Sequence, residues 1–483
     1  MPEAPTLAQR GTIERYHEAI ARDLGEGAIL SDRELMAPYL KEWRDLYRGV
    51  TPFVLRPRDT SEVARMVVHA AELGVALVPQ GGNTGLVGGQ IPHEHGAEVV
   101  VSLTRMSRIS PVDQEGASVT VEAGAILSDV HEAADAAGLL FPVSLASKGS
   151  ARIGGLIATN AGGVGVLAYG NMRDQVLGLE VVLPDGRVWN GLRALHKDNV
   201  GYDLKHLFIG AEGTLGIVTR AVLKLRPKPH ALDVAMAAVA DPDAALALLR
   251  RVRGALGDAL TAYELVPRLG LEVVARHTPD TRRPFSPVPE WAVLVEASTM
   301  LPERSMREAL EAVLARAYED GLIADAVISQ SLAEARELWR LRELMSEAQS
   351  VAGGSIKHDV SVPVAKVPAF LADATAAALS VVPGARPIPF GHLGDGNIHF
   401  NVSQPEGADK AEYLSRWEAM NEAVHAVVKR YGGSIAAEHG IGRLKAPLVA
   451  GVRDAVELDL MRTLKRALDP AGLMNPGRVL PEG

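Results

Sequence analysis

Glycine is unevenly distributed along this chain of 483 residues, and that distribution constrains the fold more than any other feature. Of the 47 glycines, 18 lie within four short stretches, at residues 81–89, 149–165, 391–396 and 432–442. Glycine weakens helices and strands, but it permits positive φ angles and lets another group approach the main chain closely. The four stretches therefore mark tight turns or places where a ligand lies against the backbone.

Composition excludes several classes of protein. Acidic residues outnumber basic ones, 59 to 50, and Phe, Trp and Tyr make up only 4% of the chain, which disfavours a nucleic-acid-binding protein. The chain has no cysteine, so disulfides, zinc–thiolate sites, iron–sulfur clusters and cysteine nucleophiles are excluded. Any metal must therefore bind through nitrogen or oxygen.

Location is inferred from what the hydropathy pattern lacks. The N-terminal stretch carries acidic residues throughout and has no long apolar core, and no stretch of 18 uncharged apolar residues occurs. We therefore expect a cytoplasmic protein without a transmembrane segment, for which peripheral contact with a membrane and a homodimeric state both stay open.

The order of expected elements indicates more than one folding unit. At roughly 150 residues per domain, the length allows about three units or two large ones. A helix at 61–73 and strands at 75–79, 98–103, 118–122, 178–183 and 216–225 are followed by a linker with two prolines, 226–229. Beyond it, Ala- and Leu-rich helical stretches, the clearest at 331–350, alternate with short strands, which is typical of an α+β domain.

The first two glycine clusters have the character of anion sites. Residues 79–89 follow a buried strand and contain few side chains that could pack in a core. Successive N–H groups that point into one concavity bind anions such as pyrophosphate, and the Thr84 hydroxyl adds a donor. Residues 148–163 repeat this chemistry, and two such nests suit a dinucleotide. A plain surface loop is the alternative. The P-loop motif is absent, and the one near-match to the Rossmann motif, 163–168, follows no clear strand.

Four motifs, PQGGNTGLVGG, KGSARIGGLIATNAGGVGVLAYG, GLEVVLPDGRV and DLKHLFIGAEGTLGIVT, resemble the FAD domain of the vanillyl-alcohol-oxidase type over about residues 75–225. The resemblance implies an α+β protein with a two-part FAD-binding domain, 1–227 and 432–483, around an inserted α+β substrate domain, 228–431, that carries an antiparallel sheet. It also implies non-covalent FAD, because the first loop lacks the histidine that often tethers flavin. The residues assigned to FAD are Pro79, Gly81, Gly82, Asn83, Thr84, Gly85, Gly149, Ser150, Gly154, Gly155, Asn160, Gly162, Gly163, Glu212, Gly213, Ile217 and Asn475.

Residues 391–401, GHLGDGNIHFN, contain the Asp-Gly signal of a tight hairpin. If Asp-Gly forms a two-residue turn, His392 lies directly opposite His399, with both imidazoles within reach of one metal ion and Asn401 on the same face. The stretch 432–442 offers Glu438 and His439, and two His plus one Glu form a catalytic type of metal site. Satisfied core or surface histidines are the alternative, and sequence spacing alone does not bring 438 to 399.

GHLGDGNIHFN and AEHGIG resemble the metal and catalytic motifs of the FAD-linked D-2-hydroxyacid dehydrogenases. The resemblance implies that His392, His399 and Glu438 bind Zn²⁺, with Mn²⁺ or Fe²⁺ also suited to the set, and that His439 is the base. A metal ion on the substrate hydroxyl would lower its pKa, and a neutral histidine would accept the proton near pH 7 while hydride passes to flavin.

LWRLRELMSEA followed by SIKHDVSVP resembles the carboxylate clamp of the 2-hydroxyglutarate-specific members, which implies that Arg342, Ser346 and Lys357 bind the second carboxylate. Asn401, on the face of the histidine pair, and His439, as the base, are also assigned to the substrate. We therefore predict oxidation of D-2-hydroxyglutarate to 2-oxoglutarate, with an electron-transfer flavoprotein or a quinone as acceptor. A D-lactate dehydrogenase or an enzyme like the D subunit of glycolate oxidase is the alternative within the family. A zinc hydrolase that uses the two His and one Glu is the alternative of a different class.

Overall fold

The computed structural model describes residues 6–481, which divide into two compact units. Unit 1 contains the chain up to Gly163, then Gly170–Lys228, and then the chain from Glu438 onward. Unit 2 contains Val164–Tyr169 and Pro229–Ala437. Two separate segments of the chain thus belong to unit 2. The shorter one forms helix α6 (Val166–Tyr169), and its place in unit 2 was not expected from the sequence.

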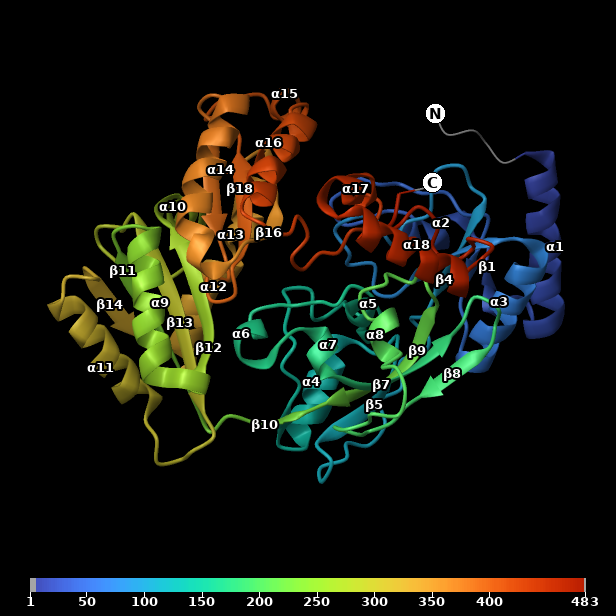
Figure 1. Ribbon diagram of the computed structural model, residues 1–483, viewed down its shortest axis with the longest axis horizontal. Coiled ribbons are helices and arrows are strands. Elements are labelled where there is room, and N and C mark those ends of the chain that lie inside the picture. Colours follow the sequence, from blue (N-terminus) through green and yellow to red (C-terminus); the bar gives the residue numbers. More distant parts are fainter. Residues whose placement is uncertain (1–5, 482–483) are drawn as a thin grey trace. The chain divides into compact units, whose positions relative to one another are not determined.

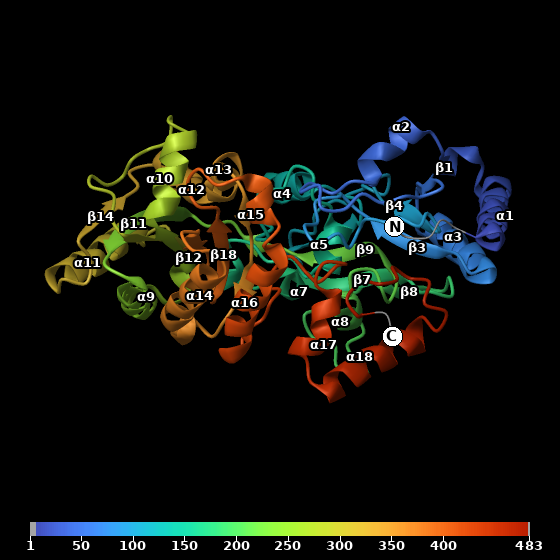
Figure 2. The same cartoon turned by 90° about the horizontal axis from the view of Figure 1, so that it is seen from above.

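The first sheet of unit 1 has the strand order β1-β2-β4-β3, in which β2, β4 and β3 are parallel and β1 is antiparallel to β2. Helix α3 makes the crossover from β2 to β3, and α1 packs against it (Figures 1 and 2). Because β3 ends at Gln80, its carboxyl end opens directly into the first glycine-rich loop. The elements of this part are α1 (Leu7–Leu24), β1 (Ile29–Leu30), α2 (Arg33–Met36), β2 (Val54–Leu55), α3 (Thr60–Leu73), β3 (Ala76–Gln80) and β4 (Glu98–Ser102).

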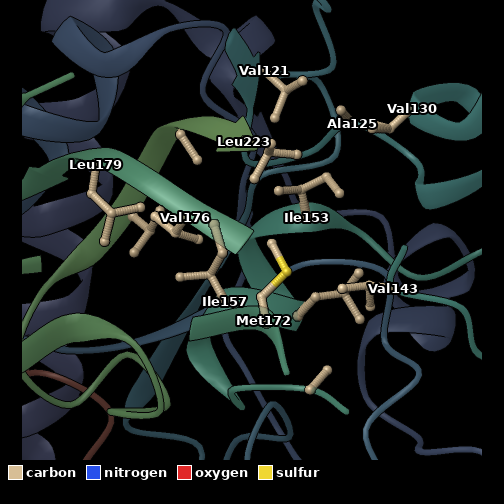
Figure 3. Packing of buried hydrophobic residues seen from close by; sticks show 14 of the residues in the cluster. Val121, Ala125, Val130, Val143, Ile153, Ile157, Met172, Val176, Leu179 and Leu223 are labelled. Atoms are coloured by element: carbon tan, nitrogen blue, oxygen red, sulfur yellow. The ribbon is translucent and has the colours of Figure 1, made fainter. Parts of the chain in front are cut away.

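The second sheet of unit 1 is antiparallel, with the order β5-β9-β7-β8. Its inner face carries Val121, Leu179 and Leu223, and Figure 3 shows Ile153 and Ile157 packed beneath it. Both isoleucines are fully buried, which stabilises the fold by about 1.5–3 kcal/mol each and holds the helix of the second glycine-rich stretch in place. The elements are β5 (Ser118–Glu122), α4 (Leu127–Ala136), α5 (Ile153–Ala158), α7 (Met172–Gln175), β7 (Val176–Val182), β8 (Val188–Gly191), α8 (Lys205–Phe208), β9 (Ile217–Lys224), α17 (Val449–Val452) and α18 (Ala455–Leu468), with β6 (Leu139–Leu140) paired to β10 (Arg226–Pro227).

The first sheet of unit 2 is antiparallel, with the order β12-β13-β11-β14. One face packs against α9 and α11, and the other packs against α10, α12 and α13 (Figure 1). The expected helix 331–350 is interrupted at Leu344, so it forms two helices instead of one. The elements are β11 (Ala231–Val239), α9 (Pro242–Leu256), β12 (Leu260–Pro267), α10 (Arg268–His277), β13 (Trp291–Thr299), α11 (Met306–Glu319), β14 (Asp325–Ile328), α12 (Leu332–Glu343) and α13 (Met345–Val351).

The second sheet of unit 2 is built around β18, which pairs with β15, β16 and β17. Helices α14 and α16 lie side by side in both views (Figures 1 and 2). The stretch Val364–Val381 is apolar and long enough, by length and composition alone, to cross a membrane, but Phe370, Leu371 and Ala374 on one of its faces are buried in the domain. The elements are β15 (Ser355–Ile356), β16 (Asp359–Ser361), α14 (Val367–Val381), β17 (Arg386–Phe390), β18 (Asn397–Ser403), α15 (Lys410–Leu414) and α16 (Trp417–Arg430).

Candidate active site

The first glycine-rich loop of unit 1 presents a row of main-chain N–H groups. Between Gly81 and Gly89, none of these groups donates to an acceptor within the described range 6–481. Side chains shape the loop instead. Asn83 Nδ2 donates to the carbonyl groups of Pro38 and Lys41, both at 2.8 Å, and Gln90 Nε2 donates to the Gly85 carbonyl at 2.9 Å. The N–H groups, with the neighbouring Thr84, are therefore available to an anion.

The two glycine-rich stretches of unit 1 pack directly against each other. A Cβ atom on Gly82 would lie 2.0 Å from the Ser150 carbonyl oxygen, so only glycine fits there. A Cβ on Gly81 would lie 3.6 Å from the amide nitrogen of Gly155, in the first turn of α5. Gly149 and Gly155 themselves border open space. The amides of both stretches thus converge on one cradle, which fits the pyrophosphate of a dinucleotide.

Several residues predicted to bind cofactor shape this cradle through their own packing. Asn160 has φ +49°, and its Oδ1 accepts the Arg173 N–H at 2.9 Å. Gly154 packs against Ala123, and a Cβ added to Gly154 would lie 2.7 Å from the Ala123 Cβ. Ile217 is 1% exposed and belongs to the core, and Gly162 is also buried. Asn160, Gly154, Ile217 and Gly162 therefore contribute to the packing of unit 1 around the cradle.

Glu212 and Asn475 connect three segments of unit 1. The Glu212 carboxylate accepts the N–H groups of Ile441 at 2.7 Å and Gly442 at 2.8 Å. Asn475 Nδ2 donates to the main-chain oxygen of Glu212 at 2.7 Å and to that of Gly89 at 3.1 Å. Burial raises the pKa of Glu212, although the two N–H donors oppose this. The loop that contains Glu438 and His439 is thereby attached to the cradle.

Glu438 and His439 begin the last segment of unit 1. A Glu438 carboxylate oxygen accepts the N–H of Gly163, at the end of the second glycine-rich stretch, at 2.7 Å. Potential ligand atoms of Glu438 and His439 lie within 4.8 Å of each other. Gly213, with φ +74°, packs against Pro79 at the end of β3. Unit 1 therefore carries the predicted base and one predicted metal ligand beside its glycine-rich stretches.

In unit 2, the turn that carries His392 differs from the predicted hairpin. The register pairs Phe390 with His399, whereas the two-residue turn predicted His392 opposite His399. The reason is competition from β12, because Gly391 forms a bridge with Leu265 and the chain leaves β17 there. The shift is by two residues, which keeps the side chains on the same face. The His392 and His399 ring centroids are accordingly 5.5 Å apart.

A buried carboxylate on β12, Glu264, orients His392. Its Oε1 lies 2.7 Å from His392 Nδ1, and its Oε2 accepts the Nε–H of Arg342 at 2.6 Å. Burial by itself raises the pKa of Glu264, but the charges and hydrogen bonds of His392 and Arg342 lower it to about 2. A carboxylate on Nδ1 directs Nε2 outward as the ligand atom, as around many metal-bound histidines. Arg342 Nη2 lies 3.5 Å from that Nε2.

Glu264 and Asp359 were not identified from the sequence. Asp359 is the register partner of His399, and their potential ligand atoms lie within 4.8 Å of each other. It is 2% exposed and accepts a hydrogen bond from Asn397 Nδ2 at 3.1 Å. Unit 2 therefore brings two imidazoles and a carboxylate together on one sheet, with Asn401 buried farther along β18. The available signal was a charged residue inside a buried strand, as in LTAYELVP.

The predicted substrate clamp is partly assembled. Lys357 Nζ donates to the main-chain oxygen of Ser346 at 2.9 Å and lies 3.0 Å from the hydroxyl groups of Ser346 and Ser350. Arg342 is instead buried, bonded to Glu264 and stacked 4.7 Å from the centre of the Phe390 ring. The structure thus brings Ser346 and Lys357 together, while Arg342 belongs to the His392 cluster.

Two family models match the chain. Residues 51–191 match an FAD binding domain, and residues 228–479 match the C-terminal domain of FAD linked oxidases. These ranges contain both glycine-rich stretches of the cradle and the whole histidine turn.

Similar proteins have names that agree with these matches. D-2-hydroxyglutarate dehydrogenase of Arabidopsis thaliana, named mitochondrial, is 38% identical over 458 residues, which cover 95% of this chain and 80% of the relative. D-2-hydroxyglutarate dehydrogenase of Xanthomonas citri pv. viticola is 39% identical over 90% of this chain and 91% of its own length. Among solved structures, p-cresol methylhydroxylase has a TM-score of 0.77 at 16% identity and 98% coverage of both chains, and alkyldihydroxyacetonephosphate synthase has a TM-score of 0.74 at 17% identity, covering 99% of this chain and 87% of its own.

Proposed function

Because this chain belongs to the FAD-linked oxidase family, has the vanillyl-alcohol-oxidase type fold and is an FAD-dependent D-2-hydroxyacid dehydrogenase, we propose that it oxidises D-2-hydroxyglutarate to 2-oxoglutarate. The relatives with that name support the substrate, since their similarity extends over nine-tenths or more of the chain. The observation in the structure that carries the proposal is the Lys357–Ser346 pair, which offers a cation and a hydroxyl to a second carboxylate.

FAD is the group that the cradle of unit 1 is suited to hold, and when bound it would supply the acceptor for the hydride from C2 of the substrate. The free N–H groups between Gly81 and Gly89 and that of Gly155 would donate to its pyrophosphate. No histidine occurs between residues 79 and 89, so we propose non-covalent binding.

A divalent metal is proposed on His392, His399 and Glu438, where it would lower the pKa of the substrate hydroxyl. Zn²⁺ suits two imidazoles and a carboxylate, and Mn²⁺ or Fe²⁺ also fits this donor set. The Glu264 contact supports the assignment, because it leaves His392 Nε2 as the ligand atom. The Arg342 contact with Nε2 would have to give way to the ion.

His439 is proposed to take the hydroxyl proton of the substrate as C2 loses a hydride, so the substrate loses two electrons and two protons in total. Arg342, Ser346, Lys357 and Asn401 would hold the carboxylates and orient C2. The electrons would then pass to an electron-transfer flavoprotein or a quinone. The cytoplasmic location expected from the sequence stays a prediction, and the names of several plant and animal relatives include the word mitochondrial.

D-Lactate or glycolate is the alternative substrate within the family. The zinc hydrolase alternative has no use for a flavin, and it is set aside because both family models are flavoprotein domains.

The experiment that tests the proposal compares kcat/KM for D-2-hydroxyglutarate, L-2-hydroxyglutarate, D-lactate and glycolate with an artificial acceptor. We expect D-2-hydroxyglutarate to exceed D-lactate at least about tenfold, because the shorter acid has no second carboxylate to bind the Lys357–Ser346 pair. A higher value for D-lactate would refute the substrate assignment.

A further inference from the structure

We propose that Glu212 is a positioning residue for His439, acting through the main chain of the loop 438–442, and not a residue that lines the cofactor. The inference rests on the proposed role of His439 as base. It concerns unit 1 alone, since Glu212 and the loop both belong to that unit.

The Glu212 carboxylate uses both of its oxygens on this loop. Oε1 accepts the Ile441 N–H at 2.7 Å, and Oε2 accepts the Gly442 N–H at 2.8 Å. These N–H groups lie two and three residues after His439, so the two hydrogen bonds restrict the main chain that carries the imidazole. Hydrogen bonds to an ionised acceptor are stronger than neutral ones, and the Glu212 side chain that accepts both is buried.

The two glycines of the loop that follow His439 have no space for a side chain, and one of them packs against the same carboxylate. Gly440 has φ +81°, and a Cβ there would lie 2.8 Å from Glu212 Oε1. Gly442 has φ +53°, and a Cβ there would lie 2.3 Å from the Val87 carbonyl oxygen. A side chain at either position would displace the loop 438–442 from these contacts. The Glu212 contact thus accounts for Gly440, and the close approach of Val87 accounts for Gly442.

The backbone of Glu212 is itself held in an unusual conformation. Its φ is +50°, which is costly for a residue with a Cβ and persists only where the surroundings impose it. The Glu212 N–H donates to the Ala158 carbonyl at 2.8 Å, and its own carbonyl accepts Asn475 Nδ2 at 2.7 Å. The residue is thus fixed at both ends, with its carboxylate committed to the loop.

Glu212→Gln tests the contact, because a glutamine has only one acceptor oxygen and would place an NH₂ group against the second N–H. We expect the FAD content and substrate KM to stay near wild type, while the rate of flavin reduction falls about 100-fold, as a misplaced catalytic group predicts. Glu180→Gln is the matched control: this buried carboxylate of unit 1 accepts the hydroxyl groups of Thr60 and Thr219 and touches no part of the loop.

A double-mutant cycle with His439→Ala separates the inference from the proposed function. If Glu212 acts through His439, Glu212→Gln adds no further loss in the His439→Ala background. Normal flavin reduction by His439→Ala would refute the proposed base. Slow flavin reduction by His439→Ala together with a normal rate for Glu212→Gln would refute the positioning role alone. The positioning role would also be refuted if Glu212→Gln lost FAD and its effect on the rate added to that of His439→Ala.

Gly440→Ala perturbs the same contact from the other side, should Glu212→Gln fold poorly. Gly472→Ala is its control, because Gly472 has a similar φ, +67°, with open space around it. We expect slow flavin reduction only for Gly440→Ala, and equal rates for the two alanine variants would overturn the inference.

Discussion

The cradle of unit 1 and the histidine turn of unit 2 are both rich in glycine, but they use it differently. In the cradle, glycine exposes main-chain N–H groups and lets two loops touch, as at Gly82 against Ser150. In the turn, Gly391 forms a bridge with Leu265 of β12 as the chain passes from β17 to β18, and the chemistry lies in histidine side chains beside Glu264 and Asp359. We therefore expect the cradle to bind FAD more weakly when a side chain is added to one of its glycines. We expect the turn to lose stability when one of its polar side chains is replaced.

The largest effect is expected at Glu264. Glu264→Gln leaves Arg342 and His392 without their buried counter-charge, and breaking such a pair costs about 3–5 kcal/mol. We expect this loss in urea unfolding of the metal-free protein. Glu296→Gln should cost much less, because that half-buried carboxylate of β13 accepts only from neutral donors, Thr261 and Trp339. Equal losses for the two variants would contradict this view of the turn.

Unit 1 also contains a side-chain clasp, Arg478–Glu98–His93, whose effect depends on pH. Burial raises the pKa of Glu98, but His93 and Arg478 outweigh it and lower the pKa from 4.5 to about 2. A lowered carboxyl pKa stabilises the fold above pH 4.5, and that stability disappears as the pH falls toward 2. The lowering of the pKa from 4.5 to about 2 corresponds to about 3 kcal/mol of unfolding free energy, at about 1.4 kcal/mol for each pH unit.

The measurement for the clasp is the unfolding free energy of wild type and Glu98→Gln at several pH values. The difference between the two proteins should shrink by most of that amount between pH 5 and pH 2.5. A difference that does not change with pH would show that Glu98 contributes through packing and not through charge.

The cradle is tested by adding one methyl group. Gly82→Ala places a Cβ against the Ser150 carbonyl oxygen, and overpacking of this kind costs about 1–3 kcal/mol, or roughly a 10- to 100-fold weaker Kd for FAD. Gly27→Ala is the matched control, because Gly27 lies in unit 1 outside both glycine-rich stretches and a Cβ there meets open space. Fluorescence titration of apoprotein with FAD measures both. Equal affinities would mean that the contact between the loops does not shape the site.

The smallest effect is expected at the exposed edge of unit 2. Lys357→Met removes the cation beside Ser346 and should raise KM for D-2-hydroxyglutarate about tenfold while leaving KM for D-lactate nearly unchanged. Lys357 is a cleaner test of the clamp than Arg342, because loss of Arg342 also leaves Glu264 unpaired. Equal increases for both acids would exclude a role in recognising the second carboxylate.

The same contrast explains what could be predicted from the sequence. The glycine-rich loops were predictable because their signal is local: a buried strand runs straight into a row of glycines. The register of the histidine turn was predicted wrongly because its competing partner, Leu265 on β12, is distant in sequence. Glu264 and Asp359 escaped notice for the same reason, since each acquires its role only when the strands of unit 2 pair. The break at Leu344 is also set by tertiary packing, because SLAEARELWRLRELMSEAQS contains no helix breaker.

The most direct test of the central claim is an anaerobic titration of the FAD-loaded protein with D-2-hydroxyglutarate, followed through the flavin absorption band. We predict that the band bleaches as the substrate is oxidised, and that prior removal of metal with a chelator abolishes the bleaching. Bleaching by D-lactate but not by D-2-hydroxyglutarate would contradict the substrate, and bleaching that survives chelation would contradict the metal-assisted step.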